Sequence, residues 1–140
     1  MRRNDREITD INEIFAILDR CDSICLGMND GDRPYVIPMT FGCELKEGRI
    51  AVYVHCAGEG HKIDLLARDP AVCVEGHIYE RVEMLNDGGI TARYESVIGF
   101  GGARRVADAA EKVHAMKIML AHYNNSGFPV TSCSGMQRVE

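Results

Sequence analysis

The segment Tyr53-Val54-His55-Cys56-Ala57-Gly58-Glu59-Gly60-His61-Lys62 changes its pattern within ten residues. It begins as a strand, in which His55 lies on the same face as Ala51, and it ends at the start of a helical pattern. Gly58 and Gly60 allow a sharp turn between the two elements. The segment therefore predicts a strand that leads through a glycine turn into a short helix over residues 61–68.

The same turn is a candidate site for a phosphate group. The first backbone amides of a helix have no partner within the helix, and the helix dipole favours an anion there. Lys62, together with His61, adds positive charge at this place. A tight turn with a solvated lysine is the simpler interpretation, and spacing alone favours it, because the glycines match neither a dinucleotide fingerprint nor a P-loop.

The residues before this segment predict one helix followed by strands. Residues 10–20 carry apolar side chains at helical spacing, and Asp10, with Glu13 three positions later, matches a capping box. From residue 23 onward, apolar residues alternate or form short runs between turn sequences, which predicts strands over 23–28, 34–41 and 50–55. Pro38 cannot donate a ladder hydrogen bond, so its strand is expected at an edge or a bulge.

The residues after the segment predict two more strands and a helix. Extended patterns occupy 71–78 and 94–107, residues 79–90 are ambiguous, and Asp108 caps a helical pattern over 108–123. The run Gly99-Phe100-Gly101-Gly102 indicates bending or the close approach of another group. Residues 124–140 show no clear periodicity. Because strands and helices do not alternate regularly, we expect one α+β domain over 1–140, mainly β, built as an antiparallel barrel with a few helices.

Composition narrows the classes of function. The chain has 140 residues, 46% of them hydrophobic, and a net charge of −5, which favours one domain and disfavours a nucleic-acid partner. No apolar run of about 18 residues occurs, so no membrane span is expected. The charged N-terminal residues lack the apolar region of a signal peptide. A cytoplasmic location is therefore expected.

The cysteines are expected to be reduced thiols. A cytoplasmic compartment disfavours disulfides, and no Cys-x-x-Cys pair occurs. The histidines of the second half of the chain show no metal-ligand spacing with cysteines or acidic residues, so no metal site is expected. Cys56 is the exception to watch, because it adjoins the candidate phosphate turn. The full set is Cys21, Cys25, Cys43, Cys56, Cys73 and Cys133.

Four motifs in the same order and spacing carry a resemblance to a known family. The chain resembles the nitroimidazole-resistance branch of the pyridoxamine 5′-phosphate oxidase-like family from Arg2 to about Tyr123. This resemblance implies a six-stranded antiparallel split β-barrel, a homodimer, and flavin mononucleotide (FMN) bound at the dimer interface. The motifs are Arg2-Arg3-x-Asp5-Arg6-Glu7-Ile8, Pro34-Tyr35-Val36-Ile37-Pro38-Met39-x-Phe41-Gly42, Tyr53-x-His55-x-Ala57-x-x-Gly60-x-Lys62 and Glu95-Ser96-Val97-Ile98-Gly99-Phe100-Gly101.

The resemblance also implies roles for individual residues. The backbone from Val36 to Thr40 would lie along the flavin ring, and the segment from His55 to Lys62 would hold the ribityl phosphate. Lys62 matches the basic phosphate-binding position, whereas His61 stands where the family often has a second arginine or lysine. His55 matches a histidine near the flavin and is the candidate catalytic residue. The full expected cofactor-binding set is Val36, Pro38, Met39, Thr40, His55, Cys56, Ala57, Gly60, His61 and Lys62.

Two classes of function follow from the resemblance. The first is an FMN-dependent reductase or oxidase of a small molecule, for which a nitroaromatic compound is one candidate substrate. The second is a non-catalytic module that stores or senses flavin, or binds haem. Haem would need an axial ligand, and His55 is the best-placed candidate for that role.

Overall fold

The two longer helices begin at aspartate caps, as the sequence predicts. The computed structural model describes residues 4–125, 127–130 and 135–140. Helix α1 (Ile11–Asp19) follows Asp10, whose carboxylate accepts hydrogen bonds from the backbone amides of Asn12 and Glu13. Helix α3 (Ala109–His122) follows Asp108, which accepts from the amide of Glu111 at 2.8 Å. Caps of this kind stabilise a helix by about 1 kcal/mol.

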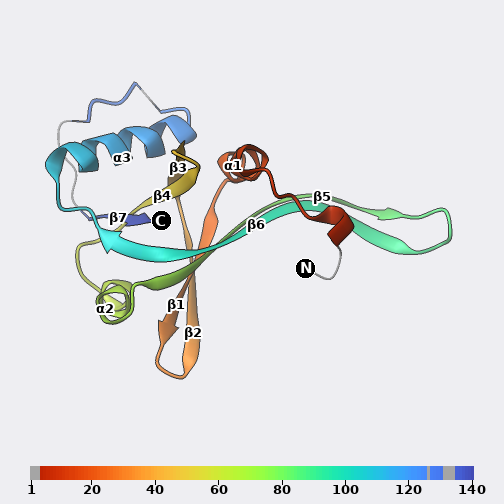
Figure 1. Ribbon diagram of the computed structural model, residues 1–140, viewed down its shortest axis with the longest axis horizontal. Coiled ribbons are helices and arrows are strands. Elements are labelled where there is room, and N and C mark those ends of the chain that lie inside the picture. Colours follow the sequence, from red (N-terminus) through yellow and green to blue (C-terminus); the bar gives the residue numbers. More distant parts are fainter. Residues whose placement is uncertain (1–3, 126, 131–134) are drawn as a thin grey trace.

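The strands form one antiparallel sheet in the order β2-β1-β5-β6-β7-β4-β3 (Figure 1). The described residues therefore contain seven strands, one more than expected. The split-barrel fold class is confirmed by the neighbours reported below. The strands are β1 (Ile24–Asp30), β2 (Arg33–Met39), β3 (Phe41–Lys46), β4 (Arg49–His55), β5 (Ala71–Met84), β6 (Ile90–Arg105) and β7 (Met136–Val139); the remaining elements are α2 (His61–Arg68) and a 3-10 turn (Asn4–Arg6).

The sheet must curl back on itself because its two edge strands are neighbours in the chain. Strands β2 and β3 stand at opposite ends of the strand order, yet only Thr40 separates them. Strand β6 passes from one half of the sheet to the other, since it pairs with β5 up to Gly102 and with β7 from Ala103. A side chain at Gly101 would collide with the Glu140 carbonyl, so this glycine allows the close backbone approach that the sequence indicates.

Strand β7 corrects the expectation for the C-terminal residues. We expected no regular structure over 124–140, but Met136–Val139 lies between β4 and β6 and joins the two halves of the barrel. Met136 and Val139 are buried, which explains why so short a strand is held firmly in place. The N-terminal pair Arg2 and Arg3, and Cys133, lie outside the described residues.

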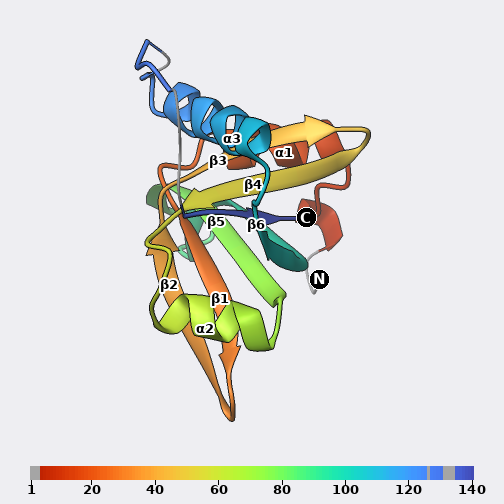
Figure 2. The same cartoon turned by 90° about the vertical axis from the view of Figure 1, so that its left-hand side faces the viewer.

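Two apolar clusters occupy opposite faces of the second half of the sheet. The larger cluster fills the inside of the curl and includes Phe41, Val52 and Val54. The smaller one includes Tyr53 and packs under α3, which lies across β3 and β4 (Figure 2). Within the described residues, none of the helices combines the length and apolar character needed to cross a membrane.

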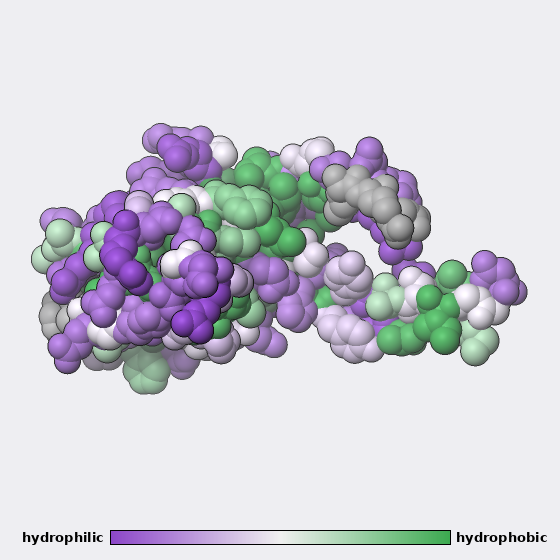
Figure 3. All heavy atoms as spheres, turned by 90° about the horizontal axis from the view of Figure 1, so that it is seen from below, coloured by the Kyte–Doolittle hydropathy of each residue, from purple (hydrophilic) through white to green (hydrophobic). Residues whose placement is uncertain are grey.

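The hairpin formed by the far ends of β5 and β6 projects from the body as an arm (Figure 1). Both strands run further than expected, because residues 79–84 and 90–93 also pair. Several apolar side chains near its end are exposed, and they form an apolar patch on the projecting part of the molecule (Figure 3). They are Val82, Met84, Leu85 and Ile90.

Candidate functional site

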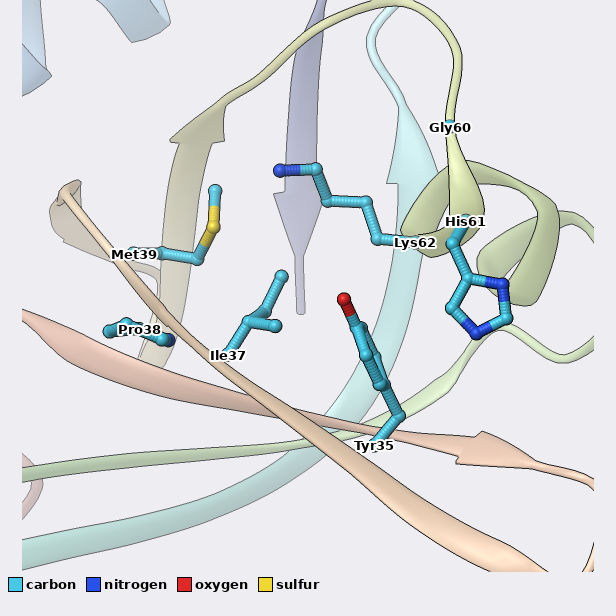
Figure 4. A pocket seen from close by; sticks show the side chains of 7 residues that line it. All are labelled: Tyr35, Ile37, Pro38, Met39, Gly60, His61 and Lys62. Carbon is cyan, nitrogen blue, oxygen red and sulfur yellow. The ribbon is translucent and has the colours of Figure 1, made fainter.

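A cavity of about 350 Å³ lies between strand β2 and the start of α2 (Figure 4). Alternation along β2 turns Tyr35, Ile37 and Met39 toward the inside of the curl. The ammonium group of Lys62 reaches into the space beside Ile37 and Met39, and the Tyr35 hydroxyl points toward the Lys62 side chain (Figure 4). Pro38, Gly60 and His61 complete the lining. The cavity thus has apolar walls from a strand and positive charge from a helix.

The start of α2 differs from the starts of the other α-helices. Gly60 precedes it with φ 120° and ψ 170°, a conformation that a residue with a side chain adopts only with strain. In the part of the chain that the structure describes, no side chain caps this end, whereas Asp10 and Asp108 cap α1 and α3. The first amides of α2 are therefore available to a ligand, and the helix dipole makes an anion the favoured ligand.

Two cations flank this uncapped end. Lys62 is half-buried, and Arg105 extends from the end of β6 to within 3.9 Å of the place where a Gly58 side chain would begin. Neither side chain forms an ion pair within the described residues. Arg104, by contrast, is engaged by Glu111 and Glu140, at 2.6 Å and 3.5 Å. Of the two neighbouring arginines, Arg105 is therefore the one that can bind a ligand at the turn.

Cys56 is held beside the turn by the residue that precedes β7. Its backbone amide donates to the Gly135 carbonyl at 3.0 Å. Burial raises the pKa of the Cys56 thiol, although the positive charges of Lys62 and Arg105 act in the opposite direction. The thiol is therefore protonated near neutral pH, which makes it a packing group here and a poor nucleophile.

His61 has partners of its own on the outer side of α2. Its Nε2 atom lies 3.0 Å from an Asp30 carboxylate oxygen, and its ring meets the edge of the Tyr35 ring at 5.0 Å. The imidazole points away from the Lys62 ammonium (Figure 4). The two basic residues that the sequence places side by side thus point in different directions.

Half of the expected cofactor-binding residues line the cavity, and half do not. Pro38, Met39, Gly60, His61 and Lys62 line it. The expected set omitted Tyr35 altogether and included Ile37 only through its backbone, although the period-two alternation with Met39 could have identified both side chains. The expected residues that do not line the cavity are Val36, Thr40, His55, Cys56 and Ala57.

His55, the candidate catalytic residue, is exposed at the end of β4. Alternation places it on the face of Ala51 and Tyr53, which belong to the cluster under α3. The cavity opens on the other face of the sheet, where Val52 and Val54 pack. Within one chain, His55 therefore does not reach the cavity, and its catalytic role stays a prediction. Within the described residues, no group of three or more histidine, cysteine or acidic side chains could hold a metal ion.

The sequence profile of the pyridoxamine 5′-phosphate oxidase family matches residues 10–135, which is most of the chain. The chain belongs to this family. The match runs from the cap of α1 to the residue before β7 and includes every residue that lines the cavity. A search of curated proteins finds no match.

Among solved structures, a candidate 5-nitroimidazole antibiotic resistance protein from Bacteroides thetaiotaomicron is 28% identical, with a TM-score of 0.82 over 94% of this chain and 80% of that one. A flavocytochrome from Azotobacter vinelandii is 19% identical, with a TM-score of 0.70 over 93% of this chain and 66% of that one. An FAD and haem binding protein from Mycobacterium smegmatis is 15% identical, with a TM-score of 0.72 over 94% and 65%. The last two support the fold alone.

Proposed function

We propose that this chain is an FMN-dependent oxidoreductase of a small molecule. Ile37 to Met39 would hold the flavin ring in the cavity, and the uncapped start of α2 would hold its phosphate. The observation that carries this proposal is the coincidence, at one turn, of free helix amides with two cations, Lys62 and Arg105, that pair with no carboxylate of the described residues. An anionic ligand removes the repulsion between these charges and supplies partners for the amides.

The residues of the site fit a flavin in shape and in charge. Ile37 and Met39 offer an apolar wall for a planar ring, and the Lys62 ammonium supplies positive charge within the same cavity. When bound, FMN supplies the electron transfer, while the protein binds it, orients it and limits the access of water to one ring face. One phosphate-sized cluster of donors favours FMN over FAD, although two of the neighbouring proteins are named for FAD.

The proposed protein is a homodimer that uses the outer face of the sheet. The strand register places Val36, Gly27, Cys73 and Phe100 in one row across β2, β1, β5 and β6. Val36 and Phe100, at the two ends of this row, are 58% and 83% exposed. An exposed apolar face of this kind indicates an interaction site. If two chains pack through this face, the exposed residues of the expected cofactor site, including Val36, lie between them.

A nitroaromatic substrate is proposed from the Bacteroides neighbour, whose name refers to 5-nitroimidazole resistance. The second candidate is a non-catalytic module for flavin or haem; two neighbours of the same fold are named a flavocytochrome and an FAD and haem binding protein. We keep the cytoplasmic location as part of the proposal.

The experiment is to purify the protein, denature it, and identify any released cofactor by chromatography and mass. FMN supports the proposal, FAD would move the assignment to the larger cofactor, and haem would favour the alternative. The flavin-loaded protein is then reduced without oxygen and mixed with a nitroimidazole. Reoxidation faster than that of free reduced FMN supports an oxidoreductase, and an equal rate contradicts it.

A further inference from the structure

The Asp30 carboxylate, at the tip of the β1–β2 hairpin, contacts both ends of α2. One of its oxygens lies 3.0 Å from His61 Nε2, and the other lies 3.4 Å from a guanidinium nitrogen of Arg68. His61 and Arg68 are the first and last residues of α2, and two helical turns bring them to the same side. One carboxylate therefore ties the whole helix to the hairpin.

A second polar contact and an aromatic contact support this tie. The Asn29 side-chain amide donates to the Asp69 carboxylate, just beyond α2, at 2.7 Å. The His61 ring also meets the Tyr35 ring nearly perpendicularly, at 87°. The hairpin thus holds both ends of α2, and the imidazole is directed toward Asp30 and away from the Lys62 ammonium (Figure 4).

The charges around Asp30 keep its carboxylate ionised. The hydrogen bond from His61 is the largest cause and lowers the pKa of Asp30. Burial, the second cause, acts in the opposite direction, and the charges of His61 and Arg33 and the hydrogen bond from Arg68 lower the pKa further. Among the described residues, these groups and the Tyr35 ring face the contact from β2 and α2.

We propose that Asp30 and His61 form a positioning pair that fixes the start of α2, so that His61 aims the phosphate-binding amides and does not itself bind the phosphate. This inference rests on the proposed FMN site, since it assigns a role within it. It also replaces the expectation from the sequence that His61 is a phosphate ligand.

The two roles of His61 predict opposite effects of one substitution. If His61 were a phosphate ligand, Asp30→Asn would release its ring and remove a nearby negative charge, so FMN would bind more tightly. If the pair positions α2, the same substitution loosens the helix start, and FMN binds more weakly. The contact is partly exposed, so we expect a loss of about two- to fivefold. Riboflavin, which lacks the phosphate, should bind both proteins equally.

The experiment titrates FMN and riboflavin into the flavin-free parent, Asp30→Asn and Asp32→Asn. Asp32 lies in the same turn, and its substitution removes the same charge without a contact to α2. Only Asp30→Asn should lose FMN affinity.

The outcomes separate this inference from the proposed function. If the parent protein does not bind FMN, both the proposed function and the positioning pair are wrong. A parent that binds FMN, with Asp30→Asn equal to Asp32→Asn or tighter than the parent, overturns the positioning pair alone. A carbon-13 NMR titration of the Asp30 carboxyl group provides a readout without flavin: its midpoint should rise in His61→Gln, and an unchanged midpoint also overturns the pair.

Discussion

Replacement of Lys62 by alanine removes the ammonium group that reaches into the cavity (Figure 4). Lys62 is half-buried and has no ion-pair partner within the described residues, so the substitution breaks no internal salt bridge. A charge-assisted hydrogen bond to a phosphate contributes about 1.5–3 kcal/mol, and about 1.4 kcal/mol corresponds to a factor of ten. Lys62→Ala should therefore weaken FMN binding by roughly ten- to a hundredfold.

The assay follows the quenching of flavin fluorescence as FMN or riboflavin is titrated into the flavin-free protein. Riboflavin should bind the parent more weakly than FMN does, and Lys62→Ala should leave its affinity nearly unchanged. Lys117→Ala, which removes an exposed lysine from α3, is the matched control and should bind FMN like the parent. An FMN affinity within twofold of the parent would refute the phosphate assignment. An equal loss for both ligands would indicate general damage to the turn.

Four further outcomes are expected. Phe100→Asp puts a charge on the exposed apolar face and should give a monomer in light scattering, whereas a persistent dimer would exclude this face as the interface. Cys43 should resist a thiol reagent at pH 8, because burial, aided by a nearby aspartate, raises its pKa to about 12, and reactivity should return only at higher pH or on unfolding. In denaturant without reductant, all six thiols should be free; fewer would indicate a disulfide or a metal site. Gly42→Ala puts a Cβ atom 2.7 Å from the Met119 backbone and should lower the free energy of unfolding in urea by about 1–3 kcal/mol. Gly99→Ala, whose Cβ atom meets nothing within 4 Å, should leave the free energy of unfolding unchanged or raise it. Equal losses of stability in the two variants would contradict the packing of α3 on β3.

The sequence predicted those features that depend on short-range chemistry. Asp10 and Asp108 cap helices because their carboxylates accept from amides two or three residues away, and such contacts are visible in the sequence. The short helix at 61–68 is confirmed for the same reason, since Gly60 and the following apolar spacing define it locally. The place of Pro38 on an edge strand is also confirmed, because the missing donor is a property of the residue itself.

The features that the sequence did not predict depend on contacts between distant segments. Strand β7 has polar residues at Gln137 and Arg138, and its strand character comes from pairing with β4 and β6 on both sides. The secondary structure of the arm was ambiguous in the sequence because its apolar residues are exposed. Without burial on one face, its strands show no regular alternation of apolar and polar residues. Tyr35 became a site residue only when the curl brought β2 against α2. The direction of His61 likewise depends on Asp30, which lies 31 positions earlier in the chain.

The most direct test of the account is an absorption titration of the flavin-free protein with FMN. We expect flavin bands that shift on binding and saturate at one FMN per chain, with no comparable binding in a protein that lacks both cations, Lys62→Ala/Arg105→Ala. A spectrum that stays the sum of free FMN and protein would contradict the central claim, and so would equal saturation by the double variant.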